Sequence, residues 1–174
     1  MSIDNIQLNS YLCEKMFSKT LLDLTKTAGT GNNQQDVKKN LSKKIKINSL
    51  GDNERNILFL VNNNENKFLA DDEMKLLTDL LQACKISMGD IALVNFYENR
   101  EMNYQELLEQ FQSKKILMFG VSAADLDLPF AIPFFQIQKF QEQIYMICPS
   151  LSDFINNVEL KKDLWKSLKK IFSL

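Results

Sequence analysis

Residues 57 to 61 read Ile57-Leu-Phe-Leu-Val61, and after a polar loop residues 71 to 85 read Asp71-Asp-Glu-Met-Lys-Leu-Leu-Thr-Asp-Leu-Leu-Gln-Ala-Cys-Lys85. The first run is uniformly apolar, which is typical of a strand covered on both faces. The second has apolar residues at positions 74, 77, 81 and 84 and further ones at 76, 80 and 83, so it predicts a helix covered on two sides. Asp90 to Phe96 predicts a second strand. This order is typical of a parallel strand pair joined by a helix.

The alternation of strands and helices continues to the C-terminus. We expect a helix from Asn103 to Gln112, opened by an Asn103-x-x-Glu106 capping box, and a strand from Lys115 to Phe119. Later elements are a short helix capped by Ser122-x-x-Asp125, strands at 134–138 and 144–148 joined by a turn at 139–143, a helical turn capped by Ser150-x-x-Asp153, and a helix at 158–172 with Trp165 as a core anchor. An edge strand at Ile45 and Ile47 is a further expectation. The sequence therefore predicts an α/β fold: a three-layer α/β/α sandwich with a mainly parallel four- to five-stranded sheet.

An amphipathic helix is expected before this domain. Its apolar residues recur close to every fourth position, with neither glycine nor proline inside. The predicted organisation is an N-terminal amphipathic helix at 1–27, a polar basic linker at 28–43 and a single α/β domain at 44–174. A tethered amphipathic helix is suited to a partner's groove, and packing against its own domain is the alternative. The predicted partner-binding residues are Leu8, Tyr11, Leu12, Met16, Phe17 and Leu21.

Composition narrows the classes of function. The 174 residues include no histidine, so serine or cysteine triads with a histidine base and zinc sites with histidine ligands are excluded. The three cysteines lack CxxC spacing and lie in apolar segments, which indicates buried free thiols. No apolar run approaches the length of a membrane span, and the first residues do not resemble a secretory signal. We therefore expect a cytoplasmic protein with no membrane association.

Polar residues that follow the predicted strands form the candidate ligand crevice, because open α/β sheets bind ligands beyond the carboxyl ends of their strands. Its residues are Asn62, Asn63, Asn64, Asn95, Gly120, Pro149 and Ser150. The loop at 62–67 has no glycine, which argues against a phosphate-binding loop. The clusters Asp71-Asp72-Glu73 and Asp125-x-Asp127 suit helix N-termini better than Mg²⁺ coordination. We expect no catalytic residue, metal or cofactor.

Charge is unevenly distributed along the chain. Residues 57–157 hold seven basic and fourteen acidic residues, whereas residues 158–174 hold five lysines and two acids. Of the 21 basic residues only Arg55 and Arg100 are arginines, which weakens any case for base or phosphate recognition through bidentate contacts. The lysines of the last helix are interpreted as its solvated outer face.

Two stretches resemble the psi subunit family of bacterial DNA polymerase III. The first is Ile57-Leu-Phe-Leu-Val-Asn-Asn followed by Asp79-Leu-Leu-Gln-Ala-Cys-Lys-Ile-Ser-Met-Gly-Asp90 and a strand. The second and more specific is Ile147-Cys-Pro-Ser-Leu-Ser-Asp-Phe-Ile-Asn-Asn, followed by Lys161-Lys-Asp-Leu-Trp-Lys-Ser-Leu and a terminal Phe172. The resemblance covers about residues 57–174. It implies a non-catalytic DNA-replication accessory protein whose mobile N-terminal segment binds clamp-loader subunits. Its folded domain would pair with a chi-like protein that contacts single-stranded-DNA-binding protein, giving an indirect association with DNA.

The same segments are also similar to the uracil-DNA glycosylase superfamily, whose fold the psi family approximates. Cys148-Pro-Ser resembles that superfamily's final motif, which usually begins with histidine but has asparagine or methionine in mismatch-specific branches. By this resemblance Asn95 would read the edge of a flipped base. The first motif departs from the family, because Val61-Asn-Asn-Asn-Glu lacks the glycine and proline of the loop that positions the hydrolytic water. The alternative hypothesis is therefore a divergent or inactive glycosylase domain that binds DNA or a base.

Overall fold

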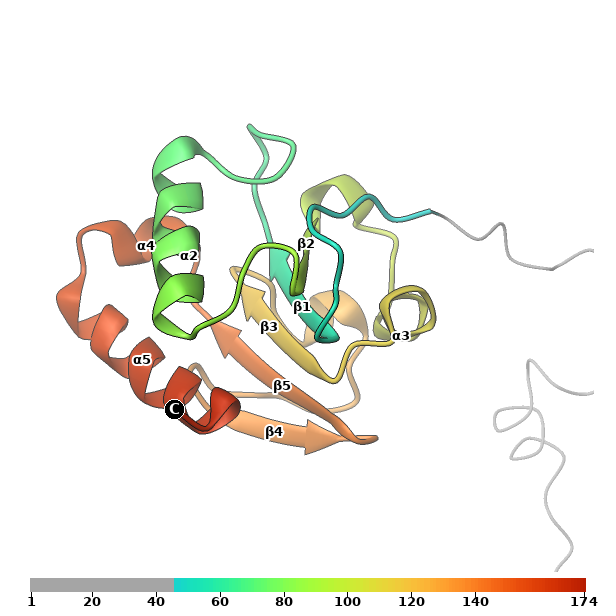
Figure 1. Cartoon of the computed structure of the whole chain (residues 1–174). Helices are drawn as coiled ribbons and strands as arrows, with labels where there is room; N and C mark the ends of the chain where they lie inside the picture. Colours follow the sequence, from blue (N-terminus) through green and yellow to red (C-terminus); the bar gives the residue numbers. More distant parts are fainter. Residues whose placement is uncertain (1–45) are drawn as a thin grey trace, which may run out of the picture. The chain divides into compact units, whose positions relative to one another are not determined.

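A five-stranded sheet forms the centre of the fold in the computed structural model, which describes residues 46–174 (Figure 1). The strands are β1 (Ile57–Val61), β2 (Ile91–Asn95), β3 (Lys115–Phe119), β4 (Ile137–Phe140) and β5 (Gln143–Cys148), in the spatial order β2-β1-β3-β5-β4. Neighbouring strands are parallel except β4, which pairs with β5 in the antiparallel sense. The predicted mainly parallel sheet is confirmed.

Helices cover both faces of the sheet. On one face lie α2 (Asp71–Ala83), α4 (Leu151–Ile155) and α5 (Val158–Phe172), packed against alternate strand residues such as Phe59 and Phe119 (Figure 1). On the other face lie α3 (Tyr104–Phe111) and the short 3₁₀ turn η2 (Ala124–Leu126), against the intervening residues such as Leu60 and Met118. A second 3₁₀ turn, η1 (Tyr97–Asn99), follows β2 and buries none of its residues. All five residues of β1 and of β2 are buried, because each strand has a helical layer on both sides. The arrangement is the expected α/β/α sandwich.

The last two strands differ from the expectation. The strand predicted at 134–138 begins three residues later in the structure, because β4 begins at Ile137 and ends at Phe140. Phe135 has a φ of 63°, a left-handed conformation that a strand cannot contain, and its N–H donates to the Ile147 carbonyl. Phe134 is left 59% exposed. The predicted turn also shortens to Gln141 and Glu142, both of which have positive φ.

A non-strand segment covers the outer edge of β2, so the expected edge strand is wrong where the structure describes it. Ile47 is buried outside any strand, and its backbone exchanges two hydrogen bonds with the Gln110 side chain, at 3.0 and 2.7 Å. Leu50 makes an isolated antiparallel bridge to Leu93. Gly51 has a φ of 93°, and a Cβ there would lie 2.3 Å from the Ile91 carbonyl oxygen, so this close approach requires glycine.

Capping and burial in the helices follow the sequence closely, with one exception. Asn103 and Glu106 form the expected reciprocal capping box of α3, and α5 has the predicted bounds. Trp165 is the exception: it is half-buried and packs at the margin of the core, whereas Phe154 is fully buried in it. Among residues 46–174, no helix is long and apolar enough to cross a membrane. The expected helix at 1–27 and linker at 28–43 lie outside the described residues.

Candidate functional site

The parallel strands bring the candidate crevice residues to one edge of the sheet. Val61 is in register with Phe119, and Phe119 with Cys148, so β1, β3 and β5 end side by side. From β1 the chain passes through α2 to β2 on one side, whereas β3 lies on the other side of β1. Open α/β sheets bind ligands at such a switch point, beyond the carboxyl ends of the strands. We refer to this end of the sheet as the carboxyl edge.

At the switch point, polar groups of the loops after β1 and β3 bond to one another. The Asn62 side-chain Nδ2 donates a 3.2 Å hydrogen bond to the Gly120 carbonyl oxygen, which connects the loops after β1 and β3. Gly120 has a φ of 68°, and a Cβ there would lie 3.4 Å from the Ser150 Cβ. The structure thus brings Asn62, Gly120 and Ser150 together and links the first two by a hydrogen bond.

Asn95, at the end of β2, has a side chain that is fully used within the fold. The residue is 1% exposed, and its Oδ1 accepts hydrogen bonds of 3.1 Å from the N–H groups of Asn63 and Tyr97. Its Nδ2 donates to the carbonyl oxygens of Asn63, Asn66 and Lys67 at 2.7, 3.1 and 3.2 Å. An amide has two N–H groups and one oxygen, so no donor or acceptor remains for a ligand. Asn95 holds the loop after β1 in place.

Asn63 and its neighbour Asn64 differ in role. The Asn63 Oδ1 accepts from the N–H groups of Glu65 and Asn66 at 3.0 and 2.8 Å, which closes a local turn. The Asn63 Nδ2 donates at 3.0 Å to Glu73, a buried carboxylate that also accepts from the Ala70 N–H. Asn64 is exposed. The glycosylase resemblance would require a glycine-rich turn that directs an asparagine toward the substrate. The loop that contains Asn63 and Asn64 has no glycine.

A cavity of about 30 Å³ lies beside Asn95. Its lining residues come from the segment before β1 and from the loops after β1 and β2: Asn48, Lys67, Phe68, Asn95, Glu98 and Asn99. This volume is close to that of one water molecule and about a tenth of the smallest usual small-molecule site. A nucleobase therefore does not fit in this cavity.

Electrostatics also disfavour an anionic ligand at the carboxyl edge. The exposed acidic residues of the loops and first helical turns there are Glu65, Asp71, Asp72, Glu98, Glu101, Asp125, Asp127 and Asp153. The exposed cations on the loops after β1 and β2 are Lys67 and Arg100, and they lie over the rings of Phe68 and Tyr97 at 5.5 and 4.1 Å. Acidic residues suit the positive ends of α2, α3 and α4, and their combined potential repels phosphates.

The serine hydroxyls at this edge lie within hydrogen-bond distance of neighbouring side chains, and the cysteine thiol is buried. The Ser122 Oγ donates to Asp125 at 2.8 Å, and the Ser150 Oγ lies 3.0 Å from the Ser152 Oγ. Asp153 accepts from the Ser150 N–H, as the predicted cap required. Burial raises the pKa of the Cys148 thiol, so this side chain stays protonated at neutral pH. Within residues 46–174, acids and cysteines form no cluster suited to a metal ion.

Sequence reasoning missed two depressions at the opposite, amino edge of the sheet. One, of about 370 Å³, is lined by Lys166, Lys169, Lys170 and Leu174 at the end of α5. The other, of about 430 Å³, is lined by Leu108, Gln112, Lys114, Glu142 and Gln143, between α3 and the turn of the β4–β5 hairpin. The five lysines at 158–174 were the available signal for the first, but their grouping around a hollow depends on how α5 ends.

Comparison of the chain with protein-family models found no matching family, and comparison with curated proteins found no matching protein.

The six partner-binding residues expected on the N-terminal helix lie outside the described residues. The described candidate site therefore consists of the carboxyl-edge crevice. Asn95 is the last residue of β2, and the other crevice residues follow the ends of β1, β3 and β5: Asn62, Asn63, Asn64, Gly120, Pro149 and Ser150.

Proposed function

We propose that this chain is a non-catalytic, cytoplasmic DNA-replication accessory protein of the psi-subunit type, which acts by protein–protein interaction with clamp-loader subunits. Its N-terminal helix would bind the clamp loader, and its α/β domain would bind a chi-like protein. The observation that carries the proposal is the resemblance of residues 147–172 to the psi family, from Cys148-Pro-Ser through the Leu164-Trp165 pair.

The geometry of the carboxyl edge favours a binding protein over an enzyme. All the hydrogen-bonding groups of the Asn95 side chain are occupied by backbone groups of the same domain. The cavity beside it has room for about one water, and the surrounding exposed residues are mostly acidic. These features support a role that does not require a nucleic-acid substrate at this edge.

A pull-down of the tagged full-length chain from its host tests the proposal. We expect clamp-loader subunits to be recovered with the wild type. The substitutions Leu12→Asp and Met16→Asp would place charges on the expected apolar face of the N-terminal helix and abolish the recovery, whereas Glu14→Lys, on the side of the expected helix opposite Leu12 and Met16, would preserve it. Because the α/β domain is unchanged in all three variants, their melting temperatures should agree. A pull-down that is reproducibly free of replication proteins would contradict the proposal.

The alternative is a glycosylase-like domain that binds DNA or a base. Cys148 ends β5, and Pro149 and Ser150 follow it at the carboxyl edge, where Ser150 lies beside Gly120; this observation favours the alternative. Incubation of stoichiometric protein with uracil-containing and mismatched duplexes, followed by alkaline cleavage, tests the alternative. Strand scission above the background of an Asn64→Ala and Ser150→Ala double variant would establish it; intact strands would exclude catalysis of this kind.

A further inference from the structure

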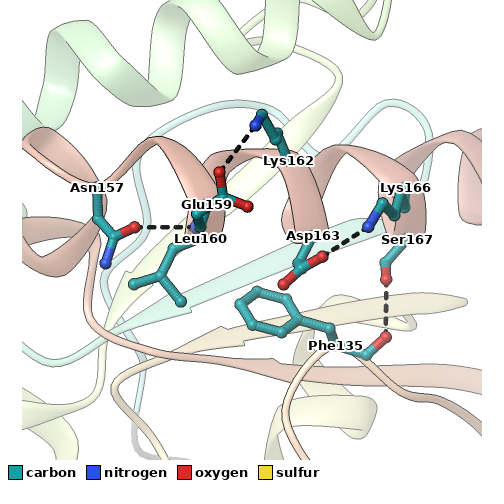
Figure 2. A network of polar contacts seen from close by, with 8 residues as sticks. All are labelled: Phe135, Asn157, Glu159, Leu160, Lys162, Asp163, Lys166 and Ser167. Atoms are coloured by element: carbon teal, nitrogen blue, oxygen red, sulfur yellow. Dashed lines mark hydrogen bonds and ion pairs between the residues drawn. The ribbon is translucent and has the colours of Figure 1, made fainter.

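Charges on the outward face of α5 are arranged differently in its two halves. In the first half, Glu159 pairs with Lys162 at 2.8 Å and Asp163 pairs with Lys166 at 2.9 Å (Figure 2). In the last turn, Lys169 and Lys170 are exposed and make no ion pair with residues of the described domain. Positive charge therefore accumulates toward the C-terminal end of the helix.

The end of α5 is held firmly against the sheet. The Ser167 Oγ donates a 2.7 Å hydrogen bond to the Phe135 carbonyl oxygen (Figure 2). Ile171 is buried in the core. The Lys115 Nζ lies 4.7 Å from the centre of the Phe172 ring, which adds a further cation to this region. The lysines of the last turn are thus presented from a fixed backbone.

The lysines at this helix end surround a hollow. Lys166, Lys169 and Lys170 line the depression of about 370 Å³ with Leu174, an apolar residue that is 46% exposed. Cations at a helix C-terminus compensate the helix dipole, which accounts for two lysines but not for the grouping of three around a shallow, open depression beside an apolar side chain. We define Lys115, Lys166, Lys169, Lys170 and Leu174 as the α5 basic surface.

We propose that the α5 basic surface binds an acidic polypeptide segment that contains apolar side chains. Carboxylates would accept hydrogen bonds from the lysine ammonium groups, and an apolar side chain would contact Leu174. A single-stranded nucleic acid fits less well, because within the described part of the chain no aromatic side chain lines the depression to stack on a base and no arginine lies there to bind a phosphate. The proposal is independent of the function proposed for the N-terminal helix.

Fluorescence anisotropy with the full-length chain tests this assignment. The probe is a short fluorescein-labelled peptide of glutamates and leucines. One comparison probe is the same peptide with glutamine in place of each glutamate, and the other is an oligothymidylate of equal length. We expect the acidic peptide to bind most tightly and its affinity to fall as salt is added. The double substitution Lys169→Gln and Lys170→Gln should raise its dissociation constant about tenfold, which corresponds to about 1.4 kcal/mol, because two exposed ion pairs with the peptide are lost.

A matched variant removes the same total charge elsewhere. Lys75→Gln on α2 with Lys162→Gln in the first half of α5 changes two exposed lysines that do not line the depression. Peptide binding by this variant should equal that of the wild type. Equal weakening by both double variants would overturn the proposal, because it would reduce the effect to net charge. Tighter binding of oligothymidylate, or the absence of peptide binding, would overturn it as well.

Discussion

The side-chain Nδ2 of Asn95 lies 2.7 Å from the backbone carbonyl oxygen of Asn63, although the two residues are 32 positions apart. The Asn95 Oδ1 also accepts a hydrogen bond from the Asn63 N–H, so the side-chain amide pairs with the Asn63 backbone as a neighbouring strand would. Loops rarely bury their backbone groups unless a partner satisfies them. Asn95 thus extends the ordered pairing of β1 and β2 beyond their last residues.

Substitution of this amide should affect stability. Asn95→Ala would leave partly buried carbonyl and N–H groups of the loop after β1 without their present partner, at a cost of about 2 to 4 kcal/mol in the free energy of unfolding. Urea unfolding followed by circular dichroism measures this loss. Asn64→Ala is the matched control in the same loop, and because Asn64 is exposed its effect should stay within about 0.5 kcal/mol. Similar stabilities for the two variants would contradict the structural role of Asn95.

Gly120 provides a test of the carboxyl-edge geometry. Gly120→Ala would force a side chain into a backbone with a φ of 68° and bring its Cβ within 3.4 Å of the Ser150 Cβ. We expect a loss of about 1 to 2 kcal/mol, since left-handed backbone is unfavourable for residues with a Cβ. Gly89→Ala is the control: its Cβ would meet its nearest atom at an ordinary 3.5 Å, and its φ is outside the left-handed range. A thermal melt that ranks the two variants in the opposite order would contradict this geometry.

We expect the ionisation of Tyr145 to lower the stability of the fold at alkaline pH. Burial, with a smaller contribution from Tyr104, raises its pKa from 10.0 to about 12. Between these pH values the unfolded chain loses the phenolic proton while the folded chain keeps it, so the free energy of unfolding decreases as pH rises, by about 2 kcal/mol at pH 12. Urea unfolding across this range measures the decrease.

Tyr145→Phe should remove that part of the pH dependence. At neutral pH the variant should be as stable as the wild type or more so, because the buried Tyr145 hydroxyl has no hydrogen-bond partner among residues 46–174. Tyr97→Phe, at a residue that is 38% exposed, should retain the alkaline loss of the wild type. If both variants keep it, Tyr145 is not its source.

Two aromatic residues of the C-terminal segment, Phe154 and Trp165, should differ in their contribution to stability. Phe154 is fully buried between Phe119 and Phe135, with both ring centroids at 6.2 Å, so Phe154→Ala should cost about 3 to 5 kcal/mol. Trp165 is only half-buried, and Trp165→Ala should cost about 1 to 2 kcal/mol because less apolar area is lost. Melting temperatures measured side by side would show the difference, and a larger loss at Trp165 would contradict its placement.

Local patterns predicted most of the elements. The bounds of α5 and β3 agree with their apolar periodicity, and Asn103 with Glu106 forms the capping box that their spacing predicted. These features depend on residues within a few positions of one another, so they are readable in a single sequence. The edges were harder: Phe135 is apolar like a strand residue, but its left-handed backbone moves the start of β4 to Ile137.

By itself, the sequence determined the α/β class, the alternation of strands and helices and the group of residues expected after the strand ends, because each follows from periodicity and local capping. Only the tertiary structure decided the strand order, the use of the Asn95 amide by a distant loop and the grouping of three lysines around Leu174. The physical reason is that these features arise from contacts between residues far apart in the chain, whose partners no local pattern identifies.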